Sequence, residues 1–371
     1  MTIVYLINRI LTALAVKNSG KMKIVIDEKI PFLQDALEAM GHSVLPLPGV
    51  EISKESLAGA GALFVRTRTR CDASLLDGTE VCFIGTATIG YDHIDSAYCA
   101  QKGIEWTNAA GCNADAVLQY VQAVVYSWAR DNDVALPGLV LGIVGVGEIG
   151  SRIDRWARSE GMRTVLNDPP RAARGEQGFS PLAEIAAQCD IITLHPTLSK
   201  GGDYPSYHLA DEAFFSSLSR CRLFINASRG PVVDNKALLK VLEGGSSMAA
   251  VLDVWEGEPQ IDLSLLNKVY IATPHIAGYS AEGKINATRQ VLEAFAAYCG
   301  GVAVPHLALQ PPVPSFVEAR SFADAALGIY SPHDDSRALK DNPAAFEEQR
   351  NNYKLRREPG AYDIKLLKTA E

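Results

Sequence analysis

Short apolar runs rich in β-branched residues recur along the chain, and they constrain its fold more than any other feature. Examples are KIVIDE, ALFVRT, LVLGIV, DIITLH and RLFINAS. Runs of this kind are typical of strands buried on both faces in a parallel sheet. Amphipathic helical patterns lie between them, for example over residues 148–157. The alternation predicts an α/β protein built from doubly wound, Rossmann-like parallel sheets with helices on both faces.

The size and composition of the chain narrow the classes of protein it can belong to. It has 371 residues, 47% of them hydrophobic, which is enough for two or three domains. A net charge of −8 argues against a general nucleic-acid surface. No run reaches the roughly 20 apolar residues that a bilayer-spanning helix needs. We therefore expect neither nucleic acid nor a membrane as partner.

The seven cysteines stand at irregular spacing without a CxxC pair. This pattern favours reduced thiols in the cytoplasm and gives no sign of a zinc or other metal site. The opening MTIVYLINRILTALAV lacks the basic start and small-residue cleavage site of a signal peptide. Because Met22 opens the first strand-like run, we interpret residues 1–21 as an N-terminal extension. An amphipathic anchor is the alternative.

The segment GVGEIG, residues 145–150, fits the GxGxxG pattern of dinucleotide-binding turns. It follows a strand-like run and opens a helical pattern, which is the context the motif requires. Gly145 and Gly147 would allow a tight turn and close approach to a pyrophosphate. The N–H groups near Glu148 and Ile149, with the helix dipole, would favour the anion. A purely structural glycine-rich turn is the alternative.

Asp168 ends the next strand-like run, RTVLN. A carboxylate about 20 residues beyond such a turn can accept hydrogen bonds from ribose hydroxyls, and it would repel a 2′-phosphate. The cofactor predicted from this residue is NAD rather than NADP, although the nearby Arg171 would weaken that preference. As an alternative, Asp168 only caps the following turn.

Polar residues stand at the carboxyl ends of several predicted strands, where sheets of this class bind ligands. They are Asp168, His195, Arg229, Asp253 and His275, with Glu258 just beyond Asp253. One edge of the predicted sheet therefore carries an arginine, a glutamate and histidines beside the predicted NAD site.

This set suits the oxidation of a 2-hydroxy acid. The hydroxyl proton needs a base with a pKa near neutrality, which histidine provides, and a carboxylate beside the ring favours its charged form. An arginine fork can hold the substrate carboxylate. We predict His275 as acid/base, Glu258 as its partner and Arg229 as substrate clamp. His195 is the alternative base.

Four separated motifs, GVGEIG, NASRGPVVD, LDVWEGEP and TPHIAGYS, resemble those of the D-isomer-specific 2-hydroxyacid dehydrogenases. The forms FIGTATIGYDHID, AAGCNADAV and LNDPPR are similar to a branch of that family that acts on a phosphorylated acid. The resemblance runs from about Met22 to residue 300 and continues more weakly in FEEQRNNYKLRRE. It implies NAD-dependent oxidation of 4-phospho-D-erythronate to 2-oxo-3-hydroxy-4-phosphobutanoate in vitamin B6 synthesis.

The resemblance also implies roles for individual residues. It places the catalytic residues at Arg229, Glu258 and His275. It places contacts with NAD at Asp168, Ala227, Ser228, Asp253 and Gly278, and contacts with substrate at Thr67, Thr88 and Tyr279. After His195 the chain has Pro-Thr where members of the family usually have Thr-Pro, so Pro196 and Thr197 are left out of the predicted cofactor contacts.

The resemblance further implies a discontinuous domain order. Residues 22–115 and 276–300 would form the substrate domain, residues 116–275 the NAD-binding domain, and residues 302–371 a small C-terminal α+β dimerisation domain. The proline-rich stretch 302–315 marks the last boundary. The tail beyond it has few apolar residues, which favours packing on a partner subunit in a homodimer.

Two groups of arginines are candidates for binding the substrate phosphate. Residues 66–70, RTRTR, would place three arginines on one face if extended, and they stand out in an acidic protein. The pair at residues 356–357 in the tail is the second candidate. A solvated strand end is the alternative interpretation of the first.

Two other functions remain compatible with these motifs. The chain could be another D-2-hydroxyacid dehydrogenase, such as a phosphoglycerate dehydrogenase. It could also be a non-catalytic, NADH-sensing binding protein of the corepressor type. Thr88, Tyr279 and the tail argue against the first alternative by resemblance, and the interpretation of the tail as a dimerisation domain argues against the second.

Overall fold

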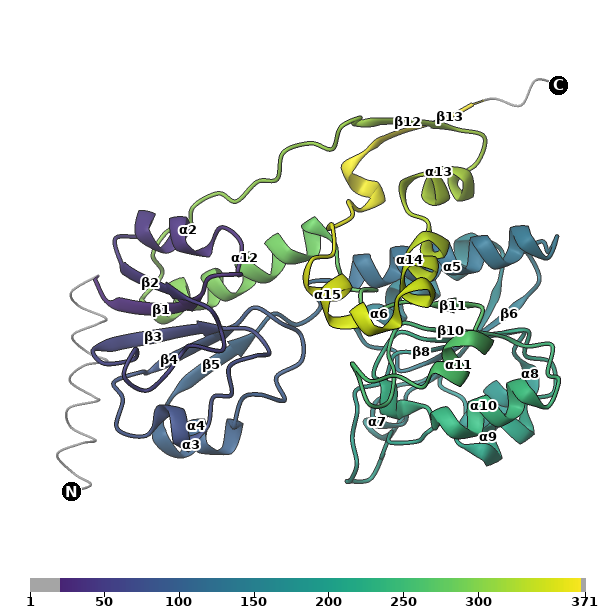
Figure 1. Ribbon diagram of the computed structural model, residues 1–371, viewed down its shortest axis with the longest axis horizontal. Helices are drawn as coiled ribbons and strands as arrows, with labels where there is room; N and C mark the ends of the chain where they lie inside the picture. The colour runs from purple at the N-terminus through teal and green to yellow at the C-terminus, as the bar shows by residue number, and fades with distance from the viewer. Residues whose placement is uncertain (1–20, 368–371) are drawn as a thin grey trace. The chain divides into compact units, whose positions relative to one another are not determined.

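The computed structural model describes residues 21–367, which fold into two compact units (Figure 1). The first unit contains the residues up to Asn113 together with Ala281–Gln310. The second contains Ala114–Ser280 together with the residues from Pro311 onward. The predicted N-terminal extension lies, up to residue 20, outside the described residues.

The first unit is built on a five-stranded parallel sheet with strand order β2-β1-β3-β4-β5. Its strands are β1 (Lys23–Asp27), β2 (Ser43–Leu47), β3 (Ala60–Val65), β4 (Phe83–Thr86) and β5 (Glu105–Asn108). Its helices are α2 (Leu33–Ala39), α3 (Ala73–Leu76), α4 (Ser96–Lys102) and α12 (Ala281–Tyr298). Ile24 and Ile26 pack with α2 and α12 on one face, whereas Val25 packs with α3 and α4 on the other. This period of two is what a strand buried on both faces requires.

The second unit contains a six-stranded parallel sheet with strand order β11-β10-β9-β8-β6-β7. Its strands are β6 (Val140–Val144), β7 (Arg163–Asn167), β8 (Ile191–Leu194), β9 (Leu223–Asn226), β10 (Ala249–Leu252) and β11 (Ile271–Ala272). Because β6 has β7 on one side and β8 on the other, the strand order reverses between β6 and β8. Sheets of this kind bind ligands at that switch point. The predicted fold class of doubly wound parallel sheets is confirmed.

Helices cover both faces of the second sheet. They are α5 (Ala114–Asp131), α6 (Glu148–Ser159), α7 (Pro169–Ala173), α8 (Leu182–Gln188), α9 (Glu212–Ser217), α10 (Asn235–Glu243) and α11 (Leu263–Lys268), with a short 3₁₀ turn η1 (Gly230–Val232). Leu141 and Ile143 pack with α5 and α6, and Val140 and Val144 pack against the opposite face with α8 and α10. Among the described residues, no helix has the length and apolar character needed to cross a membrane.

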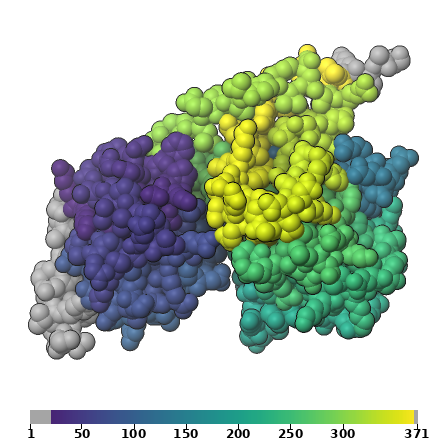
Figure 2. Space-filling model, viewed as in Figure 1, coloured from purple at the N-terminus to yellow at the C-terminus, as the bar shows by residue number. Residues whose placement is uncertain are grey.

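The C-terminal segment packs on the second unit of its own chain. It contains β12 (Phe316–Ala319), α13 (Phe322–Ile329), α14 (Pro332–Asp341), η2 (Pro343–Ala345), α15 (Phe346–Asn351), η3 (Pro359–Ala361) and β13 (Asp363–Leu366). Leu339 and Phe346 are buried in the same core cluster as Phe224 of β9. Ser336 of α14 accepts a hydrogen bond from the N–H of Ala272 on edge strand β11, at 3.0 Å. Figure 2 shows the yellow segment lying on the green second unit.

The sequence expectation for this tail was packing on a partner subunit, and the buried contacts of Leu339 and Phe346 are instead within the chain. Few apolar residues suffice because the segment adds to an existing core and does not build its own. The C-terminal dimerisation domain and the predicted domain boundaries stay predictions.

Two local features differ from what the sequence patterns indicate. No side chain caps α8, because its N-cap is Pro181 and not the preceding Ser180. Ser180 instead extends the pairing of β7, because its N–H donates to Leu166 O at 2.7 Å. Strands β2 and β5 are not among the strand-like runs quoted from the sequence. Both are edge strands, where one side of the strand has no neighbour and the apolar pattern is weaker.

Candidate active site

The glycine-rich turn after β6 is shaped by close backbone contacts. Gly145 has φ +84°, and a Cβ atom there would lie 2.5 Å from the backbone N of Pro196. At Gly150 a Cβ would lie 2.2 Å from Gly145 O, so α6 packs directly on the turn. Gly147 is different, because nothing lies within 4 Å of the position a Cβ would take. The turn therefore needs two of its glycines for its own packing, and the third borders open space.

That open space lies at the N-terminus of α6, where Gly147 is the N-cap and Glu148 and Ile149 are the first helical residues. The Glu148 carboxylate pairs with Arg152 of the same helix at 2.6 Å. The side chain of Glu148 therefore stays on the helix surface, and the N-terminus presents backbone N–H groups. Such groups, with the helix dipole, suit a phosphate anion.

Asp168 follows β7 and holds the turn in place. One carboxylate oxygen accepts a hydrogen bond from the N–H of Val146 at 2.8 Å, and the other accepts from the N–H of Arg171 at 3.1 Å, which caps α7. The capping role considered as an alternative is therefore present, and the ribose contact stays a prediction. The guanidinium of Arg171 binds the Glu176 carboxylate at 2.8 Å and Val146 O at 2.6 Å, so its charge is engaged within the protein.

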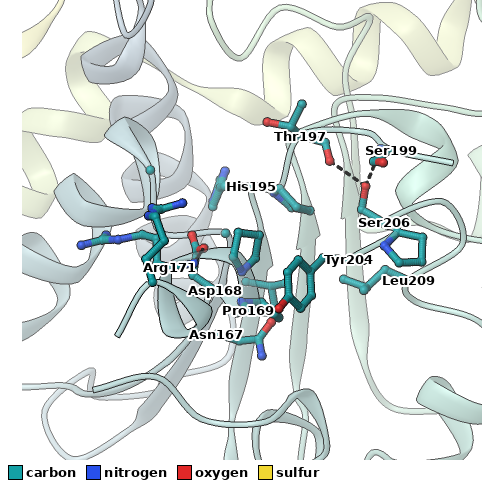
Figure 3. A pocket seen from close by; sticks show the side chains of 17 residues that line it. Asn167, Asp168, Pro169, Arg171, His195, Thr197, Ser199, Tyr204, Ser206 and Leu209 are labelled. Atoms are coloured by element: carbon teal, nitrogen blue, oxygen red, sulfur yellow. Dashed lines mark hydrogen bonds between the residues drawn. The ribbon is translucent and has the colours of Figure 1, made fainter. Parts of the chain in front are cut away.

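A cavity of about 570 Å³ lies beside this turn, at the switch point of the sheet (Figure 3). Its walls come from residues that follow β6, β7 and β8, among them Gly145, Gly147, Asp168, His195, Pro196, Thr197, Ser199, Tyr204 and Ser206. Small-molecule sites in proteins commonly have a volume of about 300–1,000 Å³. The volume, the open space at Gly147 and the helix N-terminus together fit the phosphate and nucleoside part of a dinucleotide.

The sequence analysis left Pro196 and Thr197 out, yet both line this cavity. Their place directly after a predicted strand was the signal that could have included them. No group of three or more His, Cys, Asp or Glu side chains within residues 21–367 is placed to hold a metal ion. All seven cysteines are free thiols.

His195 was the alternative base, and its surroundings argue against that role. The ring is half-buried beside the cavity, and its removal from water lowers its pKa to about 3. Its Nε2 contacts the hydroxyl of Thr193 at 2.8 Å, and its Nδ1 is a buried atom without a hydrogen-bond partner. A ring that stays neutral at physiological pH cannot exchange a proton efficiently there.

Arg229, Glu258 and His275 follow three neighbouring strands. In the parallel sheet Leu252 of β10 pairs with Asn226 of β9 and with Ala272 of β11, so the three loops begin at one edge. Gly230 lets the first two loops touch, because a Cβ there would lie 1.9 Å from Trp255 O.

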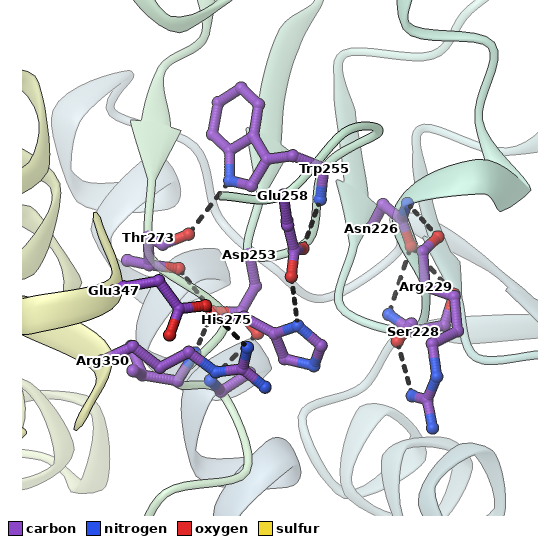
Figure 4. A network of polar contacts seen from close by, with 12 residues as sticks. Asn226, Ser228, Arg229, Asp253, Trp255, Glu258, Thr273, His275, Glu347 and Arg350 are labelled. Atoms are coloured by element: carbon purple, nitrogen blue, oxygen red, sulfur yellow. Dashed lines mark hydrogen bonds and ion pairs between the residues drawn. The ribbon is translucent and has the colours of Figure 1, made fainter. Parts of the chain in front are cut away.

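His275 and Glu258 form a hydrogen-bonded pair (Figure 4). The distance from His275 Nδ1 to Glu258 Oε2 is 2.8 Å, and Glu258 Oε1 accepts a bond from the N–H of Trp255 at 2.8 Å. Burial would raise the pKa of Glu258, but the bond and charge of His275, the N–H of Trp255 and the charge of Arg350 together lower it. The carboxylate is therefore ionised, and His275 donates from Nδ1 to it. Nε2 is then the ring nitrogen that Glu258 does not engage.

The backbone around His275 is held by Asp253. His275 has φ +60°, which is uncommon for a residue with a side chain, and its N–H donates to Asp253 O at 2.7 Å. The buried Asp253 carboxylate accepts bonds from the hydroxyl of Thr273 and the N–H of Ile276, both at 2.7 Å, and from the N–H of Ala277 at 3.0 Å. Asp253 thus positions the loop of His275, and its contact with NAD stays a prediction.

The loop of Arg229 is held by the buried Asn226, which the sequence analysis missed. Its side-chain amide donates to Arg229 O at 3.0 Å, and its oxygen accepts from the N–H and the hydroxyl of Ser228 at 3.1 and 2.9 Å. Ala227 lies in the same loop. The guanidinium of Arg229 donates one bond, to Ser228 O at 2.8 Å. An asparagine that ends a buried strand was the available signal.

The three predicted substrate residues lie in different units. Thr67 and Thr88 follow β3 and β4 of the first unit. The Thr88 hydroxyl donates to Gly90 O at 2.8 Å, and Thr67 is exposed. Tyr279 and Gly278 lie in the second unit, in the loop that begins at His275, and the Tyr279 hydroxyl contacts Arg350 Nε at 3.3 Å.

The arginine strip at residues 66–70 is not extended, so that expectation is wrong. β3 ends at Val65, and residues 67–69 form a turn. Arg66 pairs with Asp27 at 3.2 Å, and Arg70 pairs with Asp72 at 2.7 Å. Because a turn replaces the strand, the three arginines do not share one face.

Arg356 of the tail is also unsuited to binding substrate phosphate. Its buried guanidinium donates to Gln119 Oε1, Ile276 O and Ala116 O, each at 2.9 Å, and to Ala277 O. Its donors therefore serve the protein interior.

Known proteins match this chain in both sequence and fold. Residues 113–277 match the family described as D-isomer specific 2-hydroxyacid dehydrogenase, NAD binding domain. The erythronate-4-phosphate dehydrogenase of Bacteroides fragilis is 47% identical over 348 residues, which cover 94% of this chain and 100% of that protein. The enzyme of the same name from Yersinia enterocolitica is 42% identical over 91% of this chain and 93% of its own. Among solved structures, the TT0316 protein of Thermus thermophilus matches with a TM-score of 0.64 and 25% identity, covering 76% of this chain and 99% of its own.

Proposed function

The chain belongs to the family of D-isomer-specific 2-hydroxyacid dehydrogenases, and on that premise we propose that it oxidises 4-phospho-D-erythronate to 2-oxo-3-hydroxy-4-phosphobutanoate with NAD. The substrate is proposed from the names of relatives that match nearly the full chain. The structural observation that supports the chemistry best is the bond between His275 Nδ1 and the ionised Glu258 carboxylate, at the edge of the sheet that carries the dinucleotide turn.

The protein's own residues account for the proton in this reaction. NAD bound at the glycine-rich turn supplies the acceptor for the hydride from C2. His275 Nε2 takes the proton of the C2 hydroxyl, because Nδ1 is committed to Glu258. The Glu258 carboxylate, bonded to Nδ1, stabilises the imidazolium that results. Held in this way, the ring needs little reorganisation during the reaction.

Arg229 binds the substrate carboxylate and polarises the carbonyl that forms at C2. A guanidinium has five N–H donors, and one of them binds Ser228 O. The remaining donors form a planar fork that matches a carboxylate. Asn226 fixes the loop, so the fork is oriented before substrate arrives.

We further assign contacts around this centre. The backbone N–H groups at Gly147, Glu148 and Ile149 would hold the pyrophosphate, with Gly145 giving the turn its shape. Asp168 would bind the ribose, and the remaining contacts with NAD would come from Ala227, Ser228, Asp253 and Gly278. Contacts with substrate would come from Thr67, Thr88 and Tyr279.

The pathway, location and oligomeric state of the enzyme are proposed in the same way. Its product would enter vitamin B6 synthesis, its location would be the cytoplasm, and it would act as a homodimer. Relatives named for this activity and the seven free thiols support the setting. A dimer can be tested by light scattering of the purified protein.

Formation of NADH by the purified protein tests the proposed function. We expect turnover with 4-phosphoerythronate well above that with 3-phosphoglycerate or D-lactate. In His275→Ala, turnover should fall about 10²–10⁴-fold while NADH binding is kept, because only the base is lost. Preference for another acid would assign a different dehydrogenase. NADH binding without turnover of any acid would support a sensing protein instead.

A further inference from the structure

One cation near the catalytic pair comes from the C-terminal segment. Arg350 of α15 contacts the Tyr279 hydroxyl through Nε at 3.3 Å. Its positive charge is also one of the influences that lower the pKa of Glu258. Tyr279 is a predicted substrate residue, and Glu258 holds His275. Arg350 therefore lies near Tyr279 and Glu258, although the sequence motifs gave no sign of it.

Arg350 is held in this position by residues that precede it and follow it in the sequence. Phe346 is one helical turn earlier on the same face of α15, and it is buried in the core of the second unit. Arg356, after the helix, is fastened to Ile276 O and Ala277 O, which lie between His275 and Tyr279. The segment thus presents Arg350 to the loop of His275 at little further cost in conformational entropy.

The guanidinium of Arg350 is loosely paired. Its ion pair with Glu347 is 3.9 Å long, compared with 2.6 Å for Arg152 with Glu148. The side chain is 23% exposed, so part of it remains accessible to a ligand. Burial would lower its pKa, but Tyr279 and the two nearby carboxylates raise it, so the group stays charged.

A second guanidinium is present on the other side of the base. Figure 4 shows Arg229 and Arg350 on opposite sides of the His275 ring in that view. Arg229 suits a carboxylate next to the reacting carbon. A cation on the opposite side suits a second anion at the far end of the substrate.

We propose that Arg350 binds the distal phosphate of the substrate and so sets the preference for a phosphorylated acid. This inference rests on the proposed function, because it requires a substrate with an anion at each end. The C-terminal segment then supplies a specificity residue to the site on its own unit. The other candidates serve other purposes, since Arg356 is buried and Arg66 pairs with Asp27.

The test compares 4-phosphoerythronate with unphosphorylated erythronate in the full-length protein. In Arg350→Ala we expect kcat/KM for the phosphorylated acid to fall about 10- to 100-fold, mainly through KM, because a charged hydrogen-bond donor is lost. The value for erythronate should fall by a much smaller factor, because that acid has no phosphate for Arg350 to bind. Arg350→Lys should keep part of the preference, because it keeps the charge without the fork. Inorganic phosphate should inhibit the wild type competitively and the alanine variant more weakly.

The matched control is Arg337→Ala, which removes an arginine of the same segment that is 70% exposed and pairs with Asp334 at 3.6 Å. It should leave both substrates unaffected. Equal losses with both substrates in Arg350→Ala would overturn the inference and leave the proposed function standing. If the wild type does not oxidise 4-phosphoerythronate, the proposed function is wrong, and the inference is wrong with it. If Arg350→Ala does not fold, as judged by NADH binding, the KM ratio of Arg350→Lys decides.

Discussion

Glu258 links the stability of the protein to its chemistry at the level of a single residue. Its carboxylate is buried, yet its pKa is lowered by the bond and charge of His275 and by the N–H of Trp255. A group with a lowered folded pKa stabilises the folded state above its unfolded pKa, and this contribution is lost as the pH falls through the folded value. The pair of His275 and Glu258 therefore stabilises the folded state at neutral pH.

Substituting Glu258→Gln should remove this pH-dependent contribution. At neutral pH the variant should have a lower free energy of unfolding than wild type, because the amide cannot form the charged bond to His275. The difference should shrink as the pH falls through the lowered pKa of the folded-state carboxylate, where wild type takes up its proton. Urea unfolding at a series of pH values measures it. A difference that stayed constant down to the most acidic point would contradict this account.

The residue scale is also where sequence reasoning worked best. Polar side chains after buried strands pointed to Arg229, Glu258 and His275, and the structure has them on three neighbouring loops. Their catalytic roles stay predictions. Asn226 and Gly230 stand in the same motif as Arg229. Their roles depend on contacts within and between loops, among them the approach of Gly230 to the loop after β10, which no pattern within one strand reveals.

At the scale of elements, the glycines of the dinucleotide turn differ in the atoms that surround them. Gly150 faces the backbone of Gly145, because α6 packs on the turn, whereas Gly147 faces open space. The GxGxxG pattern treats these glycines as equivalent in sequence. Only their surroundings show that one serves packing and the other leaves room for a ligand.

Alanine substitutions should separate these two functions. Gly147→Ala should fold with nearly wild-type stability, since φ is −80° there and nothing lies within 4 Å, but it should bind NADH more weakly because the methyl group occupies the ligand's space. Gly150→Ala should lower the melting temperature, because its Cβ would lie 2.2 Å from a backbone oxygen. Thermal unfolding and NADH fluorescence titration measure the two effects. Equal NADH affinity in Gly147→Ala and wild type would place the pyrophosphate elsewhere.

At the scale of the whole molecule, the C-terminal segment completes the second unit. Arg356 donates to three backbone carbonyls of that unit and lies 4.5 Å from the ring centre of Tyr330. Two of these carbonyls, of Ile276 and Ala277, directly follow His275. The segment therefore connects the stability of the unit to the position of the base.

Replacing Arg356→Leu should destabilise the protein by about 3–5 kcal/mol, because buried carbonyls and Asp335 lose their cationic neighbour. It should lower kcat as well, since the loop of His275 loses its anchor. Arg337→Ala, at a surface pair in the same segment, should cost at most about 1 kcal/mol. Denaturant unfolding and steady-state turnover of both variants check this. Unchanged kcat in a destabilised Arg356→Leu would limit the residue to a structural role.

The sequence by itself determined the alternation of strand and helix, the doubly wound parallel sheets, the dinucleotide turn and the strand ends that carry Arg229, Glu258 and His275. These follow from periodicity and from short motifs, which are local properties of the chain. Tertiary structure decided where the tail packs, that residues 66–70 turn, that His195 is half-buried and neutral, and that Arg350 reaches Tyr279. Such contacts join residues that are distant in sequence. Their geometry and charge depend on burial in the folded core, which no local sequence pattern encodes.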